Sequence, residues 1–218
     1  MKSLLSSKSC KSCSMRFHWI AVAALCLSTG LTAAVAQTAE APQFRVGDRW
    51  VAERSDMLTK IKDLEFVTVV TRISAAGVEG TQAVNNGLPA QLALSPEGNY
   101  IDGPNWKNTA ESKFLSFPLT IGKTWAIKDD WTSKTSGNTG SWRGTVTVLA
   151  QERITVPAGE FETFKLQMKG FQQNNRGWNA ALTRTYWYAP AVRTTVKTEF
   201  NNNFDRYVTV LTAFTEGQ

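Results

Sequence analysis

Thiols and imidazoles, which most often carry nucleophilic, redox and zinc chemistry, occur only at the beginning of this sequence. All three cysteines (Cys10, Cys13 and Cys26) and the only histidine (His18) precede residue 37. The chain beyond residue 36 therefore cannot build a Ser-His-Asp triad, a thiol nucleophile, a Cys/His zinc site or a redox pair. We expect no metal and no cofactor, and we predict that the protein is not an enzyme.

Carboxylates are the groups left for catalysis, because glycoside hydrolysis needs two acids and no histidine. The candidate pairs are Asp129 with Asp130 and Glu160 with Glu162. Adjacent residues of a strand point to opposite faces, which argues against the first pair. The second pair shares a face but flanks a turn that should be solvated. We interpret all four as ordinary surface acids, and carboxylate-only glycosidase chemistry stays open.

Aromatic side chains supply the candidate binding residues. Of the eight tryptophans, all except Trp19 lie beyond residue 36. Three of them, Trp106, Trp131 and Trp178, lie beside polar loop residues, whereas the strand tryptophans are interpreted as core. An exposed loop tryptophan is costly to solvate unless a ligand, a membrane or another subunit covers it. We take these three, with Tyr186 and Tyr188, as the candidate ligand-binding residues.

The first 36 residues have the features of a cleaved export signal. An apolar stretch from Trp19 to Leu31 is too short to span a bilayer comfortably, and Ala34-Val35-Ala36 supplies the small residues that a signal peptidase needs. The segment before it is basic and has no acid: Lys2, Lys8, Lys11 and Arg16. We predict cleavage before Gln37, a periplasmic or secreted location and no transmembrane anchor after cleavage. The true start is Met1 or Met15.

Two other interpretations of this segment are weaker. A lipoprotein signal needs a small residue before the modified cysteine, but Leu25 precedes Cys26. Cys10-Lys11-Ser12-Cys13 has the spacing of a redox or metal pair, yet no second pair accompanies it. We interpret these cysteines as incidental residues of a discarded leader.

The charge balance depends on that leader. The full chain has 24 Lys and Arg residues against 18 Asp and Glu, and four of the basic residues precede residue 37. The remaining 20 basic residues against 18 acids provide no basic stripe, so we predict no nucleic-acid partner. Because no cysteine remains for a disulfide, packing alone must hold the fold.

Beyond residue 36, the hydrophobic pattern has a period of two nearly throughout, which is typical of antiparallel β-structure. In the clearest run, Phe164, Leu166 and Met168 alternate with polar residues. A short helix is conceivable only at 106–115. We predict one all-β domain over 37–218, built as a single curved antiparallel sheet in an open or half barrel, with a β-sandwich as the alternative. The expected strands are 49–55, 65–74, 124–129, 142–155, 161–172, 181–188, 192–200 and 206–214.

Turn residues divide these strands. Val156-Pro157-Ala158-Gly159 suits a tight reversal and predicts a hairpin between 142–155 and 161–172. The segments 132–141 and 172–179 are rich in Gly, Asn and Ser and predict surface loops.

A short motif occurs twice. Val46-Gly47-Asp48-Arg49-Trp50 and Ile121-Gly122-Lys123-Thr124-Trp125 share the form apolar-Gly-x-x-Trp. Each should open a strand, with glycine permitting the bend and tryptophan entering the core. An internal duplication and two unrelated strand starts both explain the motif.

The order of three motifs resembles a group of bacterial envelope proteins. The motifs are Phe117-Pro118-Leu119 with Ile121-Gly122-Lys123-Thr124-Trp125, Val156-Pro157-Ala158-Gly159-Glu160-Phe161, and Tyr186-Trp187-Tyr188-Ala189-Pro190. In that group a Pro-Ala-Gly-x-Phe hairpin precedes a Trp-Tyr-x-Pro strand, and its members are similar to the open β-barrels of LolA/LolB lipoprotein carriers. The resemblance covers about 117–200. It implies a curved sheet that holds acyl chains, and it implies no catalytic residue.

Two functions follow from these observations. The first is an exported, non-catalytic protein whose curved sheet binds an apolar or lipid-like ligand, which requires an inward face too large for its own side chains to fill. The second is an envelope interaction module that uses loop tryptophans to bind a glycan or a protein partner. The second function predicts that Trp106, Trp131 and Trp178 cluster at one end of the sheet.

Overall fold

The computed structural model describes residues 38–108 and 112–218, so the predicted export signal and its cleavage site lie outside the described residues. The described residues form twelve β-strands and one short 3-10 helix, and the all-β prediction is confirmed. No helix among them is long and apolar enough to cross a membrane. The elements are β1 (Arg49–Asp56), β2 (Lys62–Ser74), β3 (Gly77–Val84), β4 (Ala90–Leu94), β5 (Tyr100–Asp102), β6 (Trp106–Asn108), β7 (Thr124–Ser133), β8 (Thr139–Val156), β9 (Gly159–Asn174), β10 (Asn179–Ala189), η1 (Pro190–Val192), β11 (Thr194–Asn201) and β12 (Arg206–Thr215).

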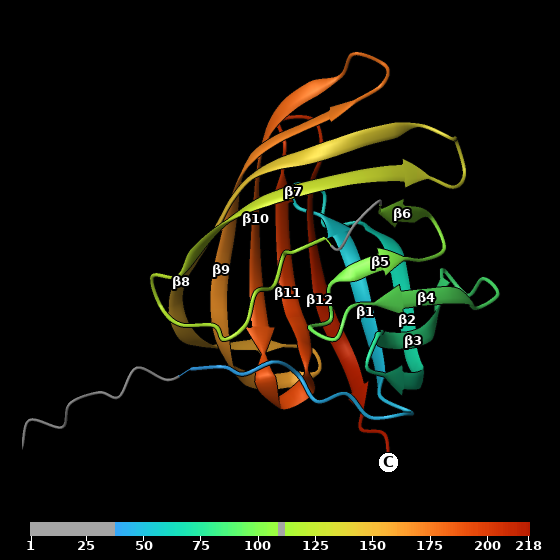
Figure 1. Ribbon diagram of the computed structural model, residues 1–218, viewed down its shortest axis with the longest axis vertical. Coiled ribbons are helices and arrows are strands. Elements are labelled where there is room, and N and C mark those ends of the chain that lie inside the picture. The colour runs from blue at the N-terminus through green and yellow to red at the C-terminus, as the bar shows by residue number, and fades with distance from the viewer. Residues whose placement is uncertain (1–37, 109–111) are drawn as a thin grey trace, which may run out of the picture. The chain divides into compact units, whose positions relative to one another are not determined.

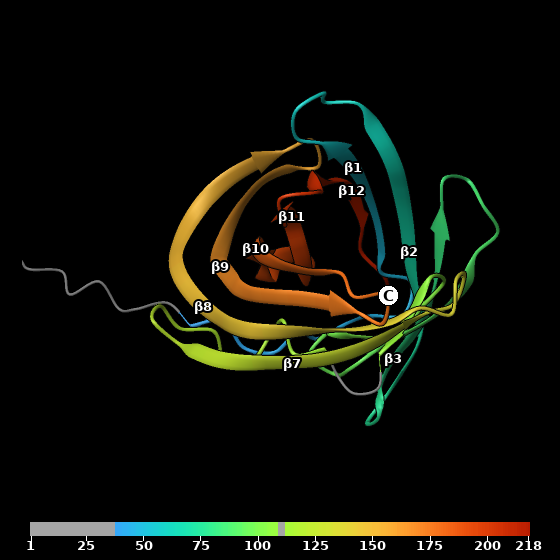
Figure 2. The same cartoon turned by 90° about the horizontal axis from the view of Figure 1, so that it is seen from above.

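The sheet is a closed barrel. Each strand pairs antiparallel with the next strand in the sequence, and β12 pairs with β1 from Arg49↔Thr215 to Asp56↔Tyr207. Figures 1 and 2 show the strands following one another around a common interior. The predictions of an open or half barrel and of a β-sandwich are therefore wrong. Alternation along one strand reports which side chains face inward, but it does not report whether two distant sheet edges meet.

The barrel wall has its shortest strands and fewest paired residues at β5 and β6. These strands have three residues each and are joined by the single pair Asp102↔Lys107. The short helix that the sequence allowed at 106–115 does not begin at residue 106, because Trp106–Asn108 form β6. Two irregular segments lie elsewhere on the wall in Figure 1: 112–123 runs in front of β9 to β12, and 38–48 runs along the lower ends of these strands. They are linked by two backbone hydrogen bonds between Ala39 and Leu119, of 3.0 and 2.8 Å.

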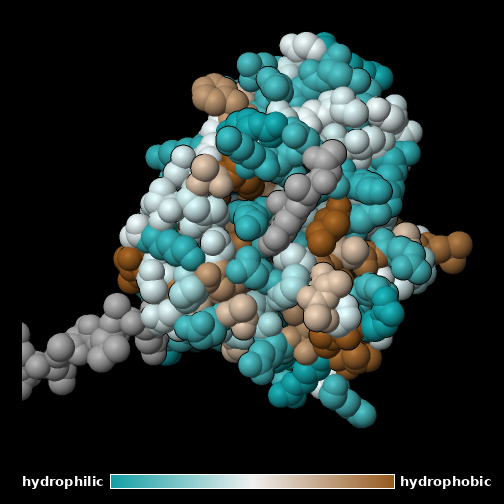
Figure 3. Space-filling model, in the orientation of Figure 1, coloured by the Kyte–Doolittle hydropathy of each residue, from teal (hydrophilic) through white to brown (hydrophobic). Residues whose placement is uncertain are grey.

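The segment 112–123 fills part of the barrel interior. Its Leu119 is fully buried, and the ring of Phe114 lies 5.6 Å from that of Trp142 and 5.5 Å from that of Tyr186. Phe117 contacts Tyr188 in the same way, with ring centroids 5.2 Å apart. These rings pack on the inward faces of β7 to β11 and form the larger hydrophobic core. The face of the molecule that Figure 3 shows is mainly hydrophilic, with small separate hydrophobic patches.

The long strands β8 and β9 bend around this core, as Figure 2 shows. Gly144 of β8 pairs with Gly170 of β9. A Cβ atom on Gly170 would lie 2.1 Å from the carbonyl oxygen of Arg143, which is too close for any side chain. Glycine is therefore required at this point of the bend. At the other end of the two strands, Val156 pairs with Gly159, which confirms the predicted hairpin.

The repeated apolar-Gly-x-x-Trp motif builds the same local structure twice. Gly47 and Gly122 have φ angles of 92° and 86°. The N–H of Gly47 donates to the carbonyl of Val70, and the N–H of Gly122 donates to the carbonyl of Val148, both at 2.9 Å. β1 and β7 thus begin alike, each tied to the strand that follows it.

A buried ion pair lies at the beginning of β1. Asp48, just before β1, contacts Arg193, which precedes β11, and Gly217, which follows β12. Asp48 is fully buried and receives two hydrogen bonds from Arg193, from Nε at 2.9 Å and from Nη2 at 2.8 Å. The N–H groups of Arg45 and Gly217 also donate to its carboxylate, at 2.8 and 2.9 Å. Burial alone would raise the pKa of Asp48, but these hydrogen bonds hold the pKa below its ordinary value.

We expect Asp48→Asn to lower the free energy of unfolding by about 3 kcal/mol at neutral pH, because it leaves the Arg193 guanidinium without a buried anion. The folded pKa of Asp48 is lowered, so its contribution is present above the unfolded pKa and disappears as pH falls through the folded value. Urea unfolding of wild type and variant across this pH range measures the difference, which should shrink in acid. Asp205→Asn, at an exposed position, is the control. Equal stability of wild type and Asp48→Asn at neutral pH would contradict this account.

Candidate functional site

The inside of the barrel contains a cavity of about 380 Å³. It lies between the inward faces of β1 to β5 and those of β10 to β12, beside the part of the interior that the segment 112–123 fills. Its volume falls within the range of small-molecule sites, about 300–1,000 Å³. The apolar and aromatic part of its wall includes Phe44, Trp50, Phe66, Leu92, Leu94 and Leu211.

Strand register explains why these side chains meet. Trp50 pairs with Thr68, and Thr68 pairs with Gln82, so one inward row crosses β1, β2 and β3. On the adjoining strands β11 and β12, Thr198 pairs with Thr209. All five residues line the cavity. The cavity wall is therefore amphipathic, with hydroxyl and amide groups between the apolar ones.

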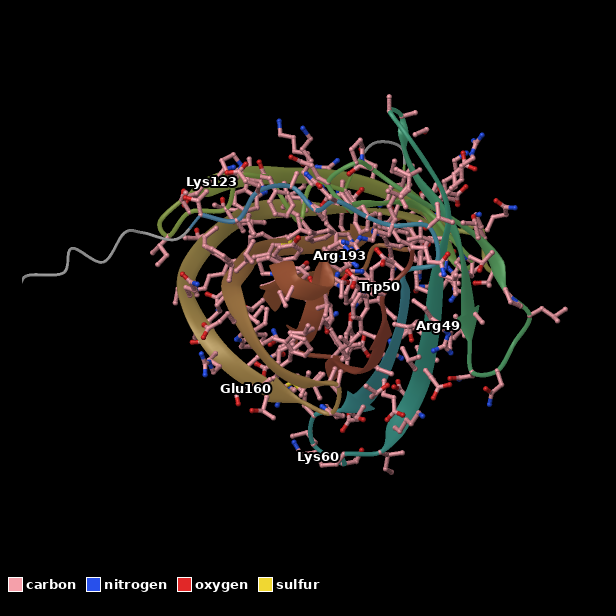
Figure 4. All side chains as sticks on the ribbon, turned by 90° about the horizontal axis from the view of Figure 1, so that it is seen from below. Arg49, Trp50, Lys60, Lys123, Glu160 and Arg193 are labelled. Atoms are coloured by element: carbon pink, nitrogen blue, oxygen red, sulfur yellow. The ribbon has the colours of Figure 1, made fainter. Side chains whose placement is uncertain are left out.

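Three arginines line the cavity, namely Arg54, Arg184 and Arg193. No Asp or Glu of residues 38–108 and 112–218 belongs to its lining. In Figure 4, Arg193 and Trp50 lie inside the ring of strands, whereas Arg49 lies on its outer side. The indole of Trp50 donates a hydrogen bond of 2.8 Å to the carbonyl of Val192, which fixes its ring at the cavity wall.

Tyr186 and Tyr188, two of the predicted binding residues, lie in the packed core and not in the cavity wall. They are 5% and 1% exposed, and burial raises the pKa of both phenols. Neither hydroxyl has a hydrogen-bond partner among the described residues. Their rings pack instead against Phe114 and Phe117.

The structure brings two of the three candidate loop tryptophans together. Trp106 is 45% exposed, and its ring meets the buried ring of Trp131 edge-on with centroids 4.9 Å apart. Trp178 packs on Phe204 instead, at 5.6 Å. Trp131 also borders a second cavity of about 370 Å³, whose other lining residues are mostly polar, including Thr132, Thr139, Ser141, Gln173, Asn174 and Asn175.

The candidate carboxylate pairs are separated or paired with arginine. Asp129 is buried, whereas Asp130 is exposed and forms an ion pair with Arg143. Burial raises the pKa of Asp129, against a hydrogen bond of 2.5 Å from the hydroxyl of Ser112. Glu160 and Glu162 are solvated and both contact Arg153. Neither pair has two acids that converge on a cavity.

Sequence reasoning missed the cavity residues, although one signal was present. Arg184 occupies an inward position of the alternating run Leu182, Arg184, Tyr186 and Tyr188, so a cation interrupts an apolar face. Such an interruption indicates either an ion pair or a ligand contact. No such interruption of an apolar run marks Arg54 or Arg193 in the sequence. Their place in the cavity wall depends on strands that are distant in the sequence.

No family model matches this chain, and no curated protein matches it. Solved structures with the same fold do. A candidate exported protein with a YmcC-like fold from Bacteroides fragilis is 15% identical, with a TM-score of 0.59 over 83% of this chain and 100% of that one. A candidate lipoprotein from Parabacteroides distasonis is 16% identical, with a TM-score of 0.56 over 82% and 100%.

The hypothetical lipoprotein YmcC from Escherichia coli is 9% identical, with a TM-score of 0.45 over 76% of this chain and 83% of that one. At 15% and 16% identity, the similarity to the structures from Bacteroides fragilis and Parabacteroides distasonis shows the fold alone. The chain is therefore similar in fold to one structure described as exported and YmcC-like, and to another described as a lipoprotein.

Proposed function

We propose that this chain is an exported, non-catalytic envelope protein that binds an apolar or lipid-like ligand inside its barrel. The observation that carries the proposal is the cavity of about 380 Å³, which the inward side chains leave open within an otherwise packed interior. Aromatic and aliphatic groups form much of its wall, and burial of an apolar ligand there would contribute about 25 cal/mol for each Å² removed from water.

The proposed location rests on two supports. The basic, apolar and small-residue segments of the first 36 residues have the order of an export signal. Two structures of similar fold are described as an exported protein and a lipoprotein. The LolA/LolB resemblance points to the same kind of role, a β-wall around an acyl chain, and in this chain the wall is closed.

Filling the cavity should abolish binding. Ala52 lines the cavity from β1, and we expect Ala52→Trp to occupy the space that a ligand would need. The protein purified from cells expressing the full chain is analysed by native mass spectrometry, followed by solvent extraction of any released molecule. We expect a stoichiometric apolar ligand on wild type and a loss of at least about tenfold in its occupancy in the variant.

Ala126→Trp is the matched control, because Ala126 lies on β7 with its side chain exposed. Near-ultraviolet circular dichroism of both variants shows whether the barrel keeps its packing. Wild-type protein that carries no ligand, and that takes up none from a bacterial lipid extract, would overturn the proposed function.

A second candidate function, glycan binding, is favoured by the exposed ring of Trp106. This ring packs on Trp131, which borders the second cavity, and amides and hydroxyls line that cavity. Aromatic faces beside amide and hydroxyl groups suit sugar rings, which present both C–H faces and hydroxyls.

For this second function, we expect Trp106→Ala to weaken binding of an N-acetylglucosamine oligosaccharide at least about tenfold, because the stacking face is lost. Isothermal titration calorimetry measures the affinity. Phe171→Ala is the control, since Phe171 is an exposed aromatic residue on β9 that does not line the second cavity. An affinity that Trp106→Ala and Phe171→Ala reduce equally would argue against a site at Trp106.

A further inference from the structure

Of the three arginines that line the barrel cavity, two are neutralised by carboxylates. Arg54 contacts Asp63 through Nε, at 3.0 Å from both carboxylate oxygens. Arg193 is paired with the buried Asp48. Arg184 is different, because no oxygen of residues 38–108 and 112–218 accepts a hydrogen bond from its guanidinium, and its Nε is buried without a partner. A guanidinium stays protonated in proteins. The charge of the Asp129 carboxylate acts on Arg184, but the two side chains form no ion pair, so the cavity carries one positive charge that no carboxylate of the described residues contacts directly.

Aromatic rings hold this cation in place. The guanidinium carbon of Arg184 lies 5.0 Å from the ring centroid of Tyr186, 5.2 Å from Phe114 and 5.3 Å from Trp142. Cation–π contacts stabilise a charge by about 0.5–2 kcal/mol each, and they leave its N–H donors free. The rings therefore stabilise the charge without using its hydrogen bonds.

The surroundings of Arg184 suit an oxyanion. Arg184 lines the cavity together with Thr198 and Thr209, whose hydroxyls can donate hydrogen bonds. The planar guanidinium fork binds carboxylate and phosphate groups through two parallel hydrogen bonds. No acidic side chain of the described residues lines the cavity to repel such a ligand.

We propose that the barrel cavity binds a single-chain amphiphile with an anionic headgroup, a carboxylate or phosphate that Arg184 receives while the alkyl chain occupies the apolar part of the lumen. The proposal rests on the proposed function and names its substrate class. The volume of about 380 Å³ lies near the lower end of the range for ligand sites, which favours one chain over two.

The test compares two ligands that differ only in the headgroup. Delipidated protein, purified from cells expressing the full chain, is titrated calorimetrically with dodecanoate and with 1-dodecanol at neutral pH, below any micelle concentration. A charged hydrogen bond of this kind corresponds to roughly 10- to 100-fold in affinity. We expect wild type to prefer dodecanoate by that factor, and Arg184→Met to remove the preference.

Two further variants make the test specific. Arg49→Met removes an arginine from the outer face of the barrel wall, and it should retain the preference for dodecanoate (Figure 4). Arg184→Lys keeps the charge but loses the planar fork, and it should show an intermediate preference. It also gives a readout if Arg184→Met does not fold, as judged by near-ultraviolet circular dichroism.

The outcomes separate the two proposals. Equal binding of dodecanoate and 1-dodecanol by wild type, or an unchanged preference in Arg184→Met, would overturn the anionic headgroup and leave the apolar cavity in place. Acetate or inorganic phosphate that binds as tightly as dodecanoate would show a site for a free anion and overturn the amphiphile. Absence of binding by either twelve-carbon ligand would overturn the proposed function, and this inference with it.

Discussion

The pairing of β1 with β12 is the interaction on which the rest of the structure depends. An antiparallel sheet left open would present two rows of unpaired backbone N–H and C=O groups, and closure removes both edges. No cysteine beyond residue 36 could form a disulfide across this seam. Hydrogen bonds between the two strands, and the Asp48–Arg193 ion pair beside them, therefore keep the inward faces turned toward one another.

Closure also determines what the interior must contain. A twelve-stranded wall surrounds more space than its own inward side chains fill. On one side the segment 112–123 occupies that space with Phe114, Phe117 and Leu119. On the other side a cavity remains, and its wall mixes apolar groups with arginine and threonine. The same constraint thus produces the hydrophobic core and the candidate site.

Local patterns predicted the strands whose faces differ most in polarity, such as 161–172 and 181–188, and the hairpin at Val156–Gly159. The strand Gly77–Val84 was missed, because two glycines and several polar residues hide its alternation. Closure was not predictable, since the register between β1 and β12 depends on contacts between opposite ends of the described chain. The cavity depends on the same distant contacts. Of the three arginines in its wall, only Arg184 was indicated by the local sequence pattern. The loop tryptophans were chosen from polar neighbours in sequence, which do not report that Trp131 is buried.

The seam between β1 and β12 has a consequence for the order of events during folding. The partners of β1 on this side are synthesised 151 to 166 residues after it, and pairing across so long a loop costs more entropy than pairing with a neighbouring strand. Proteins dominated by such non-local pairings fold slowly, in milliseconds to seconds. Until β12 arrives, β1 has an unpaired edge that can pair with another chain. When a chain of this topology crosses a membrane unfolded, it reaches its native state only after residues 206–217 have been translocated. Until then, the unpaired edge of β1 needs protection from other chains.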